Sequence, residues 1–431
     1  MKKWLGVIGV MLVVLIAAPW GVGMVTEQQW QQTTLEVNKS QPYFTVETAR
    51  YQRDLFGAEV EGTVHFRNPA HPGEAHQLGY RGEVSHGVTG SEITFYPDQA
   101  SADLIAGFFP DRLPTVTLST RLWGTVEIEY NVPAIDRLDD DTGESLTVTE
   151  SYGWARISDA GNDLEVDLRW PGLVARGPEA RFAVDDVRVT QTMSRLAGNV
   201  WTGKGKVSMA RLQAEYQNQP AVVLEDFALQ SDTSAEGDER FSSEVRMDIA
   251  RIASRDDESG PYEVEFAMEN MEVVAWNRLV DSFIDLRKLS SDQANGVTSR
   301  QALVEKQMNL MMNVSDAVKA LAGAGMSVGI PAFSVATSHG EVSGNLMLRH
   351  PELSDDDRAA MTLVMQRLTG ELSIAIPVAL AEAKPGLMTE LRPLIEQGFL
   401  VRDNDTFRLE AELKDLDVDL NGQIIPLPPM I

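Results

Sequence analysis

Alternation between apolar and polar residues dominates the chain from about residue 43 onward. In the run 164–170, for example, the sequence LEVDLRW places an apolar residue at every second position. Comparable runs cover residues 116–122, 126–130, 245–249 and 262–268. Because successive side chains of a strand point to opposite faces, these runs predict antiparallel strands with one buried and one solvated face. Clusters of Gly, Asp and Pro separate the runs, as hairpin turns require.

A helical period replaces the alternation near Trp276, where apolar residues recur every three or four positions. The C-terminal part then predicts helices over 299–321, 354–368 and 388–397, a strand over 371–376, and a hairpin over 407–420 with an Asn-Gly turn after it. We therefore expect an α+β fold. It has one N-terminal transmembrane helix, then an elongated body of mainly antiparallel β-sheet with a helical layer toward the C-terminal half.

The first residues carry the pattern of a membrane anchor. Lys2 and Lys3 precede an uncharged run over 4–26, which as a helix is roughly 34 Å long and matches a hydrocarbon core of about 30 Å. The lysines predict a cytoplasmic N-terminus, a single pass through the bacterial inner membrane and a periplasmic body. A cleaved signal peptide is the alternative, but Pro19 follows the candidate cleavage site.

These patterns predict three divisions of the chain. Residues 1–26 hold the cytoplasmic lysines and the transmembrane signal-anchor, 27–270 a β-rich periplasmic region that begins with a polar helical stalk over 27–40, and 271–431 helices plus antiparallel sheet. The last two regions form one continuous domain if the boundary near residue 271 marks only the passage from sheet to helices within it.

Composition removes several classes of partner and chemistry. Asp and Glu number 64 against 37 Lys and Arg, which argues against a nucleic-acid partner because such a partner needs a basic surface. The chain has no cysteine, so disulfides, thiolate metal sites and cysteine nucleophiles are excluded.

No motif converges on a catalytic or metal site, and we predict no catalytic residue, cofactor or metal. Four histidines lie close in sequence without a tight ligand spacing: His65, His71, His76 and His86. The acidic stretch 139–150 resembles a calcium loop, but Glu144 occupies the position that requires glycine. The glycine-rich stretch 202–206 lacks the Gly-Lys-Ser/Thr ending of a phosphate loop.

Three methionines recur at helical spacing in the second predicted helix: Met308, Met311 and Met312. They fill the core, or they line an apolar groove for an acyl chain or a partner helix, because methionine adapts to irregular apolar shapes.

A short motif follows the predicted stalk. Residues 51–56 match the pattern Tyr-x-Arg-Gly-aliphatic-Phe through Tyr51, Arg53 and Phe56, with Asp54 in place of the glycine. Since Asp adopts a positive φ less readily than Gly, the backbone role of that glycine does not carry over.

Two further motifs complete the set. The pair His86-Gly87 follows the first strands, and an aliphatic-x-aliphatic-Asn-Gly pattern near the C-terminus supplies Asn421 and Gly422. In this order, after an N-terminus with lysines and one apolar run, the motifs resemble the YdgA-like family of Gram-negative envelope proteins, a domain of unknown function. The resemblance implies an inner-membrane or periplasmic location and supplies no reaction and no catalytic residue.

We expect a non-enzymatic envelope protein that acts as a scaffold, binding or assembly module. Its expected partners are inner-membrane lipid through the N-terminal helix and an envelope protein or a second copy of the chain. A lipid or lipoprotein binding protein with an apolar groove is the first alternative. A hydrolase or metal-dependent enzyme is the second.

Overall fold

The computed structural model describes most of the chain after residue 25: residues 26–28, 30, 31, 34, 35, 38, 44–54, 56–67, 75–217, 219–255, 257–294, 300–354, 357 and 361–427. It forms two compact units, unit 1 over Met1–Thr192 and unit 2 over Met193–Ile431. Strand β11 (Ala180–Ala197) crosses the division between them.

Unit 1 is an antiparallel sheet built largely from hairpins. Its elements are β1 (Phe44–Arg53), β2 (Gly57–Arg67), β3 (Ala75–His86), β4 (Gly90–Pro97), α2 (Gln99–Ile105), β5 (Thr115–Arg121), β6 (Val126–Val132), β7 (Ile135–Leu138), β8 (Ser145–Val148), β9 (Ser151–Ser158), the 3₁₀ turn η1 (Asp159–Gly161) and β10 (Asp163–Arg176). The strands pair in the order β1, β2, β3, β4, β5, β6, β9, β10, and β10 also pairs with β8, which pairs with β7.

The described residues between Thr26 and Asn38 are helical and lie against this sheet. The Trp30 ring stacks on Phe95 at 5.3 Å between ring centroids, and its Nε1 donates to the Thr48 hydroxyl at 3.0 Å. Trp30 thereby joins the core of unit 1, which contains Ala58, Val60, Tyr80, Val84 and Ile93. The described residues of the predicted stalk 27–40 are therefore held against the sheet, chiefly through Trp30.

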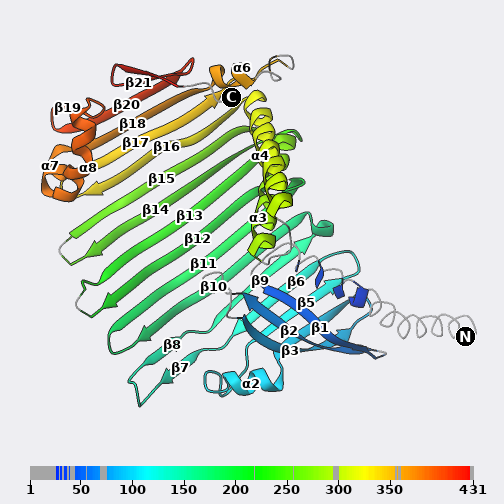
Figure 1. Ribbon diagram of the computed structural model, residues 1–431. Coiled ribbons are helices and arrows are strands. Elements are labelled where there is room, and N and C mark those ends of the chain that lie inside the picture. The colour runs from blue at the N-terminus through cyan, green and yellow to red at the C-terminus, as the bar shows by residue number, and fades with distance from the viewer. Residues whose placement is uncertain are drawn as a thin grey trace, which may run out of the picture. The chain divides into compact units, whose positions relative to one another are not determined.

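Unit 2 contains antiparallel strands that are on average longer than those of unit 1, with helices at the margins of the sheet (Figure 1). Its elements are β12 (Val200–Tyr216), β13 (Val222–Glu236), β14 (Arg240–Ser254), β15 (Asp257–Glu272), α3 (Val273–Ala294), α4 (Arg300–Gly323), β16 (Met326–Thr337), β17 (Gly340–His350), α6 (Met361–Arg367), β18 (Thr369–Pro377), α7 (Val378–Ala383), α8 (Pro385–Glu396), β19 (Val401–Asp403), β20 (Thr406–Lys414), β21 (Asp417–Leu420) and β22 (Gln423–Pro426). Strands β12 to β18 pair in chain order, followed by β20, β21 and β22, with β19 also beside β20.

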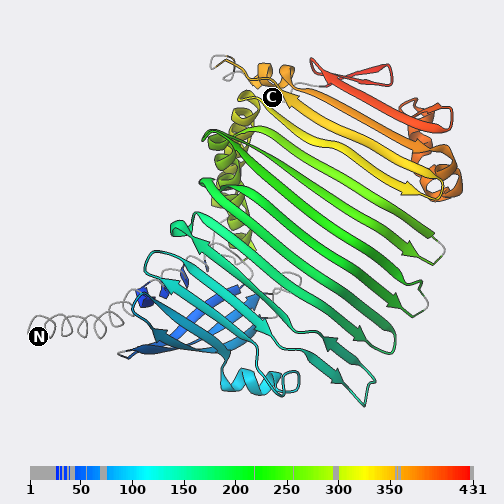
Figure 2. The ribbon, with the colours of Figure 1, turned by 180° about the vertical axis from the view of Figure 1, so that it is seen from behind.

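The helices of unit 2 cover only parts of the sheet. Helices α3 and α4 lie across one end of the strands, and α7 and α8 lie at the opposite end of β18 and β20 (Figure 1). Seen from behind, no described helix crosses the middle of β13 to β17 (Figure 2).

The predicted fold class is wrong. The chain is predominantly a large antiparallel sheet, and its helices pack at the ends of the strands and form no layer over them. The described residues include no helix that has both the length and the apolar character needed to cross a membrane. The transmembrane prediction falls on residues 1–26, of which 1–25 lie outside the described residues. Residue 271 lies within unit 2, just before the junction of β15 and α3.

Candidate functional site

One face of the unit 2 sheet is apolar from strand to strand. A single row of directly paired residues crosses eight strands from β12 to β20: Val207, Leu229, Met247, Val264, Phe333, Gly344, Ile374 and Leu409. With roughly 4.8 Å between neighbouring strands, the row is roughly 34 Å long. Every member is partly exposed. We call the face that carries this row the apolar face.

A second apolar row runs beside the first on the same face: Phe227, Ile249, Tyr262, Val335 and Val342. The most exposed large side chains of the face are Phe266, at 37%, and Leu346, at 41%. The Phe333 ring covers Gly344, since a Cβ built on that glycine would come within 2.7 Å of the ring. A face this broad with this degree of exposure is a typical binding surface.

Two helical clusters bound the apolar face. At one end Met268, on the same face as Val264, packs against the core that α3 and α4 form with Phe241, Met271 and Leu321. At the other end Leu409 packs against the core that α7 and α8 form with Phe407. Between these clusters the rows described above have no second layer of secondary structure over them among the described residues.

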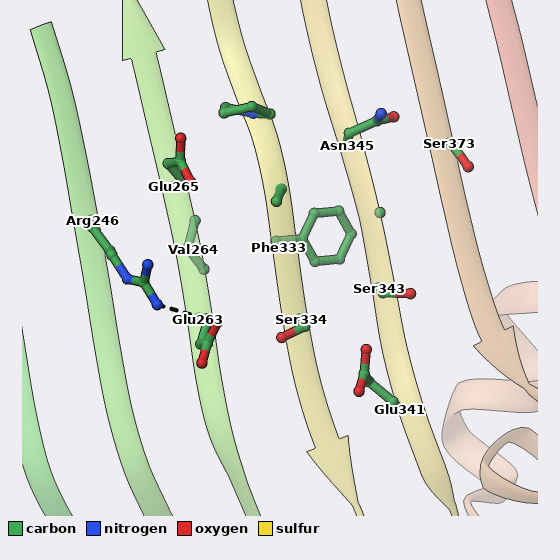
Figure 3. A pocket seen from close by; sticks show the side chains of 13 residues that line it. Arg246, Glu263, Val264, Glu265, Phe333, Ser334, Glu341, Ser343, Asn345 and Ser373 are labelled. Atoms are coloured by element: carbon green, nitrogen blue, oxygen red, sulfur yellow. Dashed lines mark hydrogen bonds and ion pairs between the residues drawn. The ribbon is translucent and has the colours of Figure 1, made fainter.

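The opposite face of the same sheet is polar and carries ion pairs between strands. Arg246 on β14 pairs with Glu263 on β15 at 3.4 Å (Figure 3), and it also bonds Asp248 of its own strand at 3.0 Å. Arg246 and Glu263 border a shallow hollow of about 380 Å³ that Ser334 and Asn345 also line. The polar face is thus satisfied by its own cross-strand pairs and water, whereas the apolar face has no comparable partner.

The structure brings three of the predicted motif residues, Tyr51, Arg53 and His86, into one region of unit 1. His86 is 5% exposed, and its Nδ1 lies 2.8 Å from the hydroxyl of Ser91, which is 3% exposed. Ser91 in turn bonds the Thr26 hydroxyl at 2.8 Å. Because the His86–Ser91 pair is buried, it is closed to a substrate, and the cluster fixes the segment after residue 25 to the sheet.

Two motif residues border this cluster. The Arg53 guanidinium bonds the Glu27 carboxylate at 3.3 Å and so adds a second tie to the N-terminal segment. The Tyr51 hydroxyl is buried, and desolvation together with the nearby Glu27 raises the pKa of Tyr51 to about 12.

The other two motif residues of unit 1 lie in turns. The Gly87 N–H donates to the Gly90 carbonyl in the β3–β4 turn, and Phe56 is exposed in the β1–β2 turn.

We expect His86 to make unit 1 less stable at acidic pH. Burial lowers the pKa of His86 from its usual 6.5, and the Arg53 guanidinium lowers it further. As the pH falls through about 6.5, the histidine of the unfolded chain takes up a proton before the buried His86 of the folded chain does. The free energy of unfolding therefore falls as the pH drops. Urea titrations of the full chain at about pH 7.5, 6.5 and 5.5, with protease cleavage within 44–176 as the readout, measure this slope.

The matched controls for that titration are two glutamine variants. His86→Gln should flatten the slope, whereas His65→Gln, at an exposed site on β2 beside Glu47, should leave it unchanged. A His86→Gln variant with the slope of the natural protein would show that the slope has another origin.

Asn421 and Gly422 lie in unit 2 and brace a turn. Asn421 has a φ of 48°, and its amide donates to Phe399 O at 2.7 Å and Arg408 O at 3.1 Å and accepts from Glu410 N at 3.2 Å. The residue therefore holds the β21–β22 turn against β20, which is a structural role.

We expect Asn421→Ala to destabilise unit 2 by about 2 kcal/mol, because it leaves backbone groups without their partners and keeps the strained φ. Asn404→Ala is the control, since Asn404 also has a positive φ, of 53°, but sits in an exposed turn. Equal midpoints for the two variants in chemical denaturation would contradict the bracing role.

The three methionines of the predicted groove lie on α4. Met308, Met311 and Met312 are exposed to 63%, 58% and 54%, so they do not fill the core. The buried side of the helix is formed instead by Leu310, Ala317 and Leu321. The core-filling interpretation of these methionines is therefore wrong, and the groove stays a prediction. The sequence analysis missed the apolar face of the sheet, although it identified alternating runs of that face as strands.

The remaining candidate motifs lie in ordinary turns and strands. Asp139 Oδ1 accepts from Asp141 N and Thr142 N, and these bonds lower the pKa of Asp139. Residues 202–206 lie in β12, where Lys204 pairs with Asp232. His71 lies outside the described residues. Within the described part of the chain no three His, Asp or Glu side chains are grouped as metal ligands.

Comparisons with known proteins give one match. No curated protein and no solved structure matches the chain. A family model described as "Bacterial protein of unknown function (DUF945)" matches residues 1–428, which is nearly the whole chain. The chain therefore belongs to this family of bacterial proteins.

Proposed function

We propose that the protein is a non-enzymatic binding module of the bacterial envelope that holds acyl chains of a lipid or lipoprotein on the apolar face of unit 2. The observation that carries the proposal is the row of partly exposed apolar residues across eight strands, from Val207 to Leu409. Covering these side chains with an apolar ligand removes them from water, which is favourable by about 25 cal/mol per Å².

The backbone of the sheet favours an acyl chain over a peptide strand. Strands β13 to β17 are each paired on both sides, so none of them offers a free edge to an added strand. A peptide strand laid over their side chains would leave its own polar groups without partners. An acyl chain has no such groups and can cross several strands.

The proposed location follows from the N-terminal sequence. Lys2, Lys3 and the uncharged run over 4–26 support attachment to the inner membrane with the body in the periplasm, close to a source of acyl chains. The motifs at Tyr51, His86 and Asn421 support the narrower assignment to the YdgA-like proteins.

A photoactivatable phospholipid with a diazirine in its acyl chain tests the function. We expect irradiation of the full chain in mixed micelles to label residues of β13 to β17 whose side chains point to the apolar face, as mapped by peptide mass spectrometry. Adducts restricted to residues 1–26, or to the polar face, would count against the proposal. Crosslinking of an envelope protein to the apolar face in cells, without lipid adducts, would instead support the scaffold hypothesis.

A further inference from the structure

Four large apolar side chains are exposed at the tips of three turns in unit 1. Phe56 is 54% exposed in the β1–β2 turn, Val88 is 42% exposed in the β3–β4 turn, and Leu122 and Trp123 are 54% and 65% exposed in the β5–β6 turn. We call these the apolar turn tips. Exposed side chains of this size are unusual at hairpin turns, which are normally polar.

The three turns are neighbours at one end of the sheet. His86 N donates to Phe56 O at 2.8 Å, which joins the β1–β2 turn to the start of the β3–β4 turn. Leu122 N donates to Thr89 O at 2.9 Å, which joins the β3–β4 turn to the β5–β6 turn. The apolar turn tips therefore form one patch.

The uncharged N-terminal run ends at the same patch. Thr26 is 3% exposed and bonds Ser91, which directly follows the β3–β4 turn. The chain on the N-terminal side of Thr26, residues 4–25, carries no charge. The most apolar stretch of the sequence is thus attached where unit 1 displays its exposed apolar turn tips.

We propose that the apolar turn tips are a lipid-bilayer contact surface that seats unit 1 on the membrane. Trp favours the interfacial zone, because its ring contacts apolar chains while its indole N–H reaches water, and Phe, Val and Leu supply apolar area at the same boundary. The position of Thr26 favours a bilayer over a protein partner, because it places the C-terminal end of the uncharged run beside the tips. The proposal does not depend on ligand binding by unit 2.

The charges beside the tips set the lipid used in the test. Asp54 is exposed in the β1–β2 turn and Arg121 is exposed at the end of β5, so the two flanking charges have opposite signs. The Arg53 charge next to Asp54 is paired with Glu27. Because the patch has no net basic charge, contact should not need anionic lipid, and phosphatidylcholine vesicles are the appropriate probe.

The absence of cysteine permits single-cysteine labelling of the full chain. We design Val88→Cys and Trp123→Cys in two of the turns, each labelled with a small fluorophore and reconstituted in phosphatidylcholine vesicles. The matched control is Leu104→Cys on α2, because Leu104 is 78% exposed and α2 follows the far end of β4. Quenching is measured with nitroxide-labelled lipid from the membrane and with iodide from the water.

We expect lipid nitroxide to quench the labels at 88 and 123 at least twofold more than the label at 104, and iodide to show the reverse order. Equal quenching at all three positions would indicate general adsorption and overturn the proposal. Full iodide access at 88 and 123 without lipid quenching would overturn it as well. Phe56→Cys, in the third turn, repeats the measurement independently if either label perturbs folding.

Discussion

The double variant Phe266→Arg/Leu346→Arg is expected to bind an acyl chain on unit 2 at least tenfold more weakly than the natural protein. Phe266 and Leu346 are the most exposed large side chains of the apolar face, at 37% and 41%, so the sheet can accept the change with little loss of stability. A bound acyl chain would instead have to cover two guanidinium groups with no acceptor nearby, and burying an unpaired charge costs several kcal/mol. Each 1.4 kcal/mol of lost binding free energy is a factor of ten in affinity.

The control places the same charge on the other side of the same sheet. Ala332 is exposed on the polar face, directly opposite Glu265 on β15. The substitution Ala332→Arg therefore places a cation beside a carboxylate, on the face that already carries Arg246. We expect photo-adduct yield from the diazirine lipid to fall in the double variant and to be unchanged in Ala332→Arg. Equal yields, with unchanged denaturation midpoints, would show that the acyl chain binds elsewhere.

The strands were predictable because their signal is local. The run 164–170 lies within β10, and the runs over 245–249 and 262–268 lie within β14 and β15. Alternation between apolar and polar residues reports which face of a strand avoids water, and neighbouring residues are sufficient to show it.

The predicted helical layer over the sheet was wrong, because local sequence does not show what a helix packs against. Helical spacing after Trp276 correctly indicates α3, but it shows only that the helix has an apolar stripe. The stripe is satisfied by a compact cluster with Phe241 and Leu321 at one end of the strands. Apolar and polar residues alternate in the same way along a strand whether or not helices cover its apolar face. The sequence therefore did not show that the apolar face of unit 2 is uncovered.

The motif residues were identified from sequence, but their grouping required the fold. Arg53 and His86 approach one another because β1 pairs with β2 and β2 pairs with β3. Ser91 and Thr26 complete the cluster, and neither carries a recognisable motif. Asn421 belongs to unit 2, where its contacts explain it as a turn residue.

Removing the Trp30 ring is expected to have the largest effect on the stability of unit 1. The ring stacks on Phe95 and meets Tyr80 edge-on at 6.5 Å, and its Nε1 bonds Thr48. Trp30→Ala removes these contacts and leaves a cavity, which should cost roughly 3 kcal/mol, the lower end of the range for a packed tryptophan. Since whole domains are stable by about 5–15 kcal/mol, this is a large fraction of the total.

Trp123→Ala is the matched control, because Trp123 belongs to the same unit and is 65% exposed. In urea titrations of the full chain in detergent, followed by protease cleavage within 44–176, we expect Trp30→Ala to lower the midpoint and Trp123→Ala to change stability by less than about 0.5 kcal/mol. The N-terminal segment should also become protease-sensitive in Trp30→Ala, because Trp30 is the residue of its described part that packs against the core of unit 1. If the two variants unfold at the same urea concentration, the segment after residue 25 does not contribute to the core of unit 1.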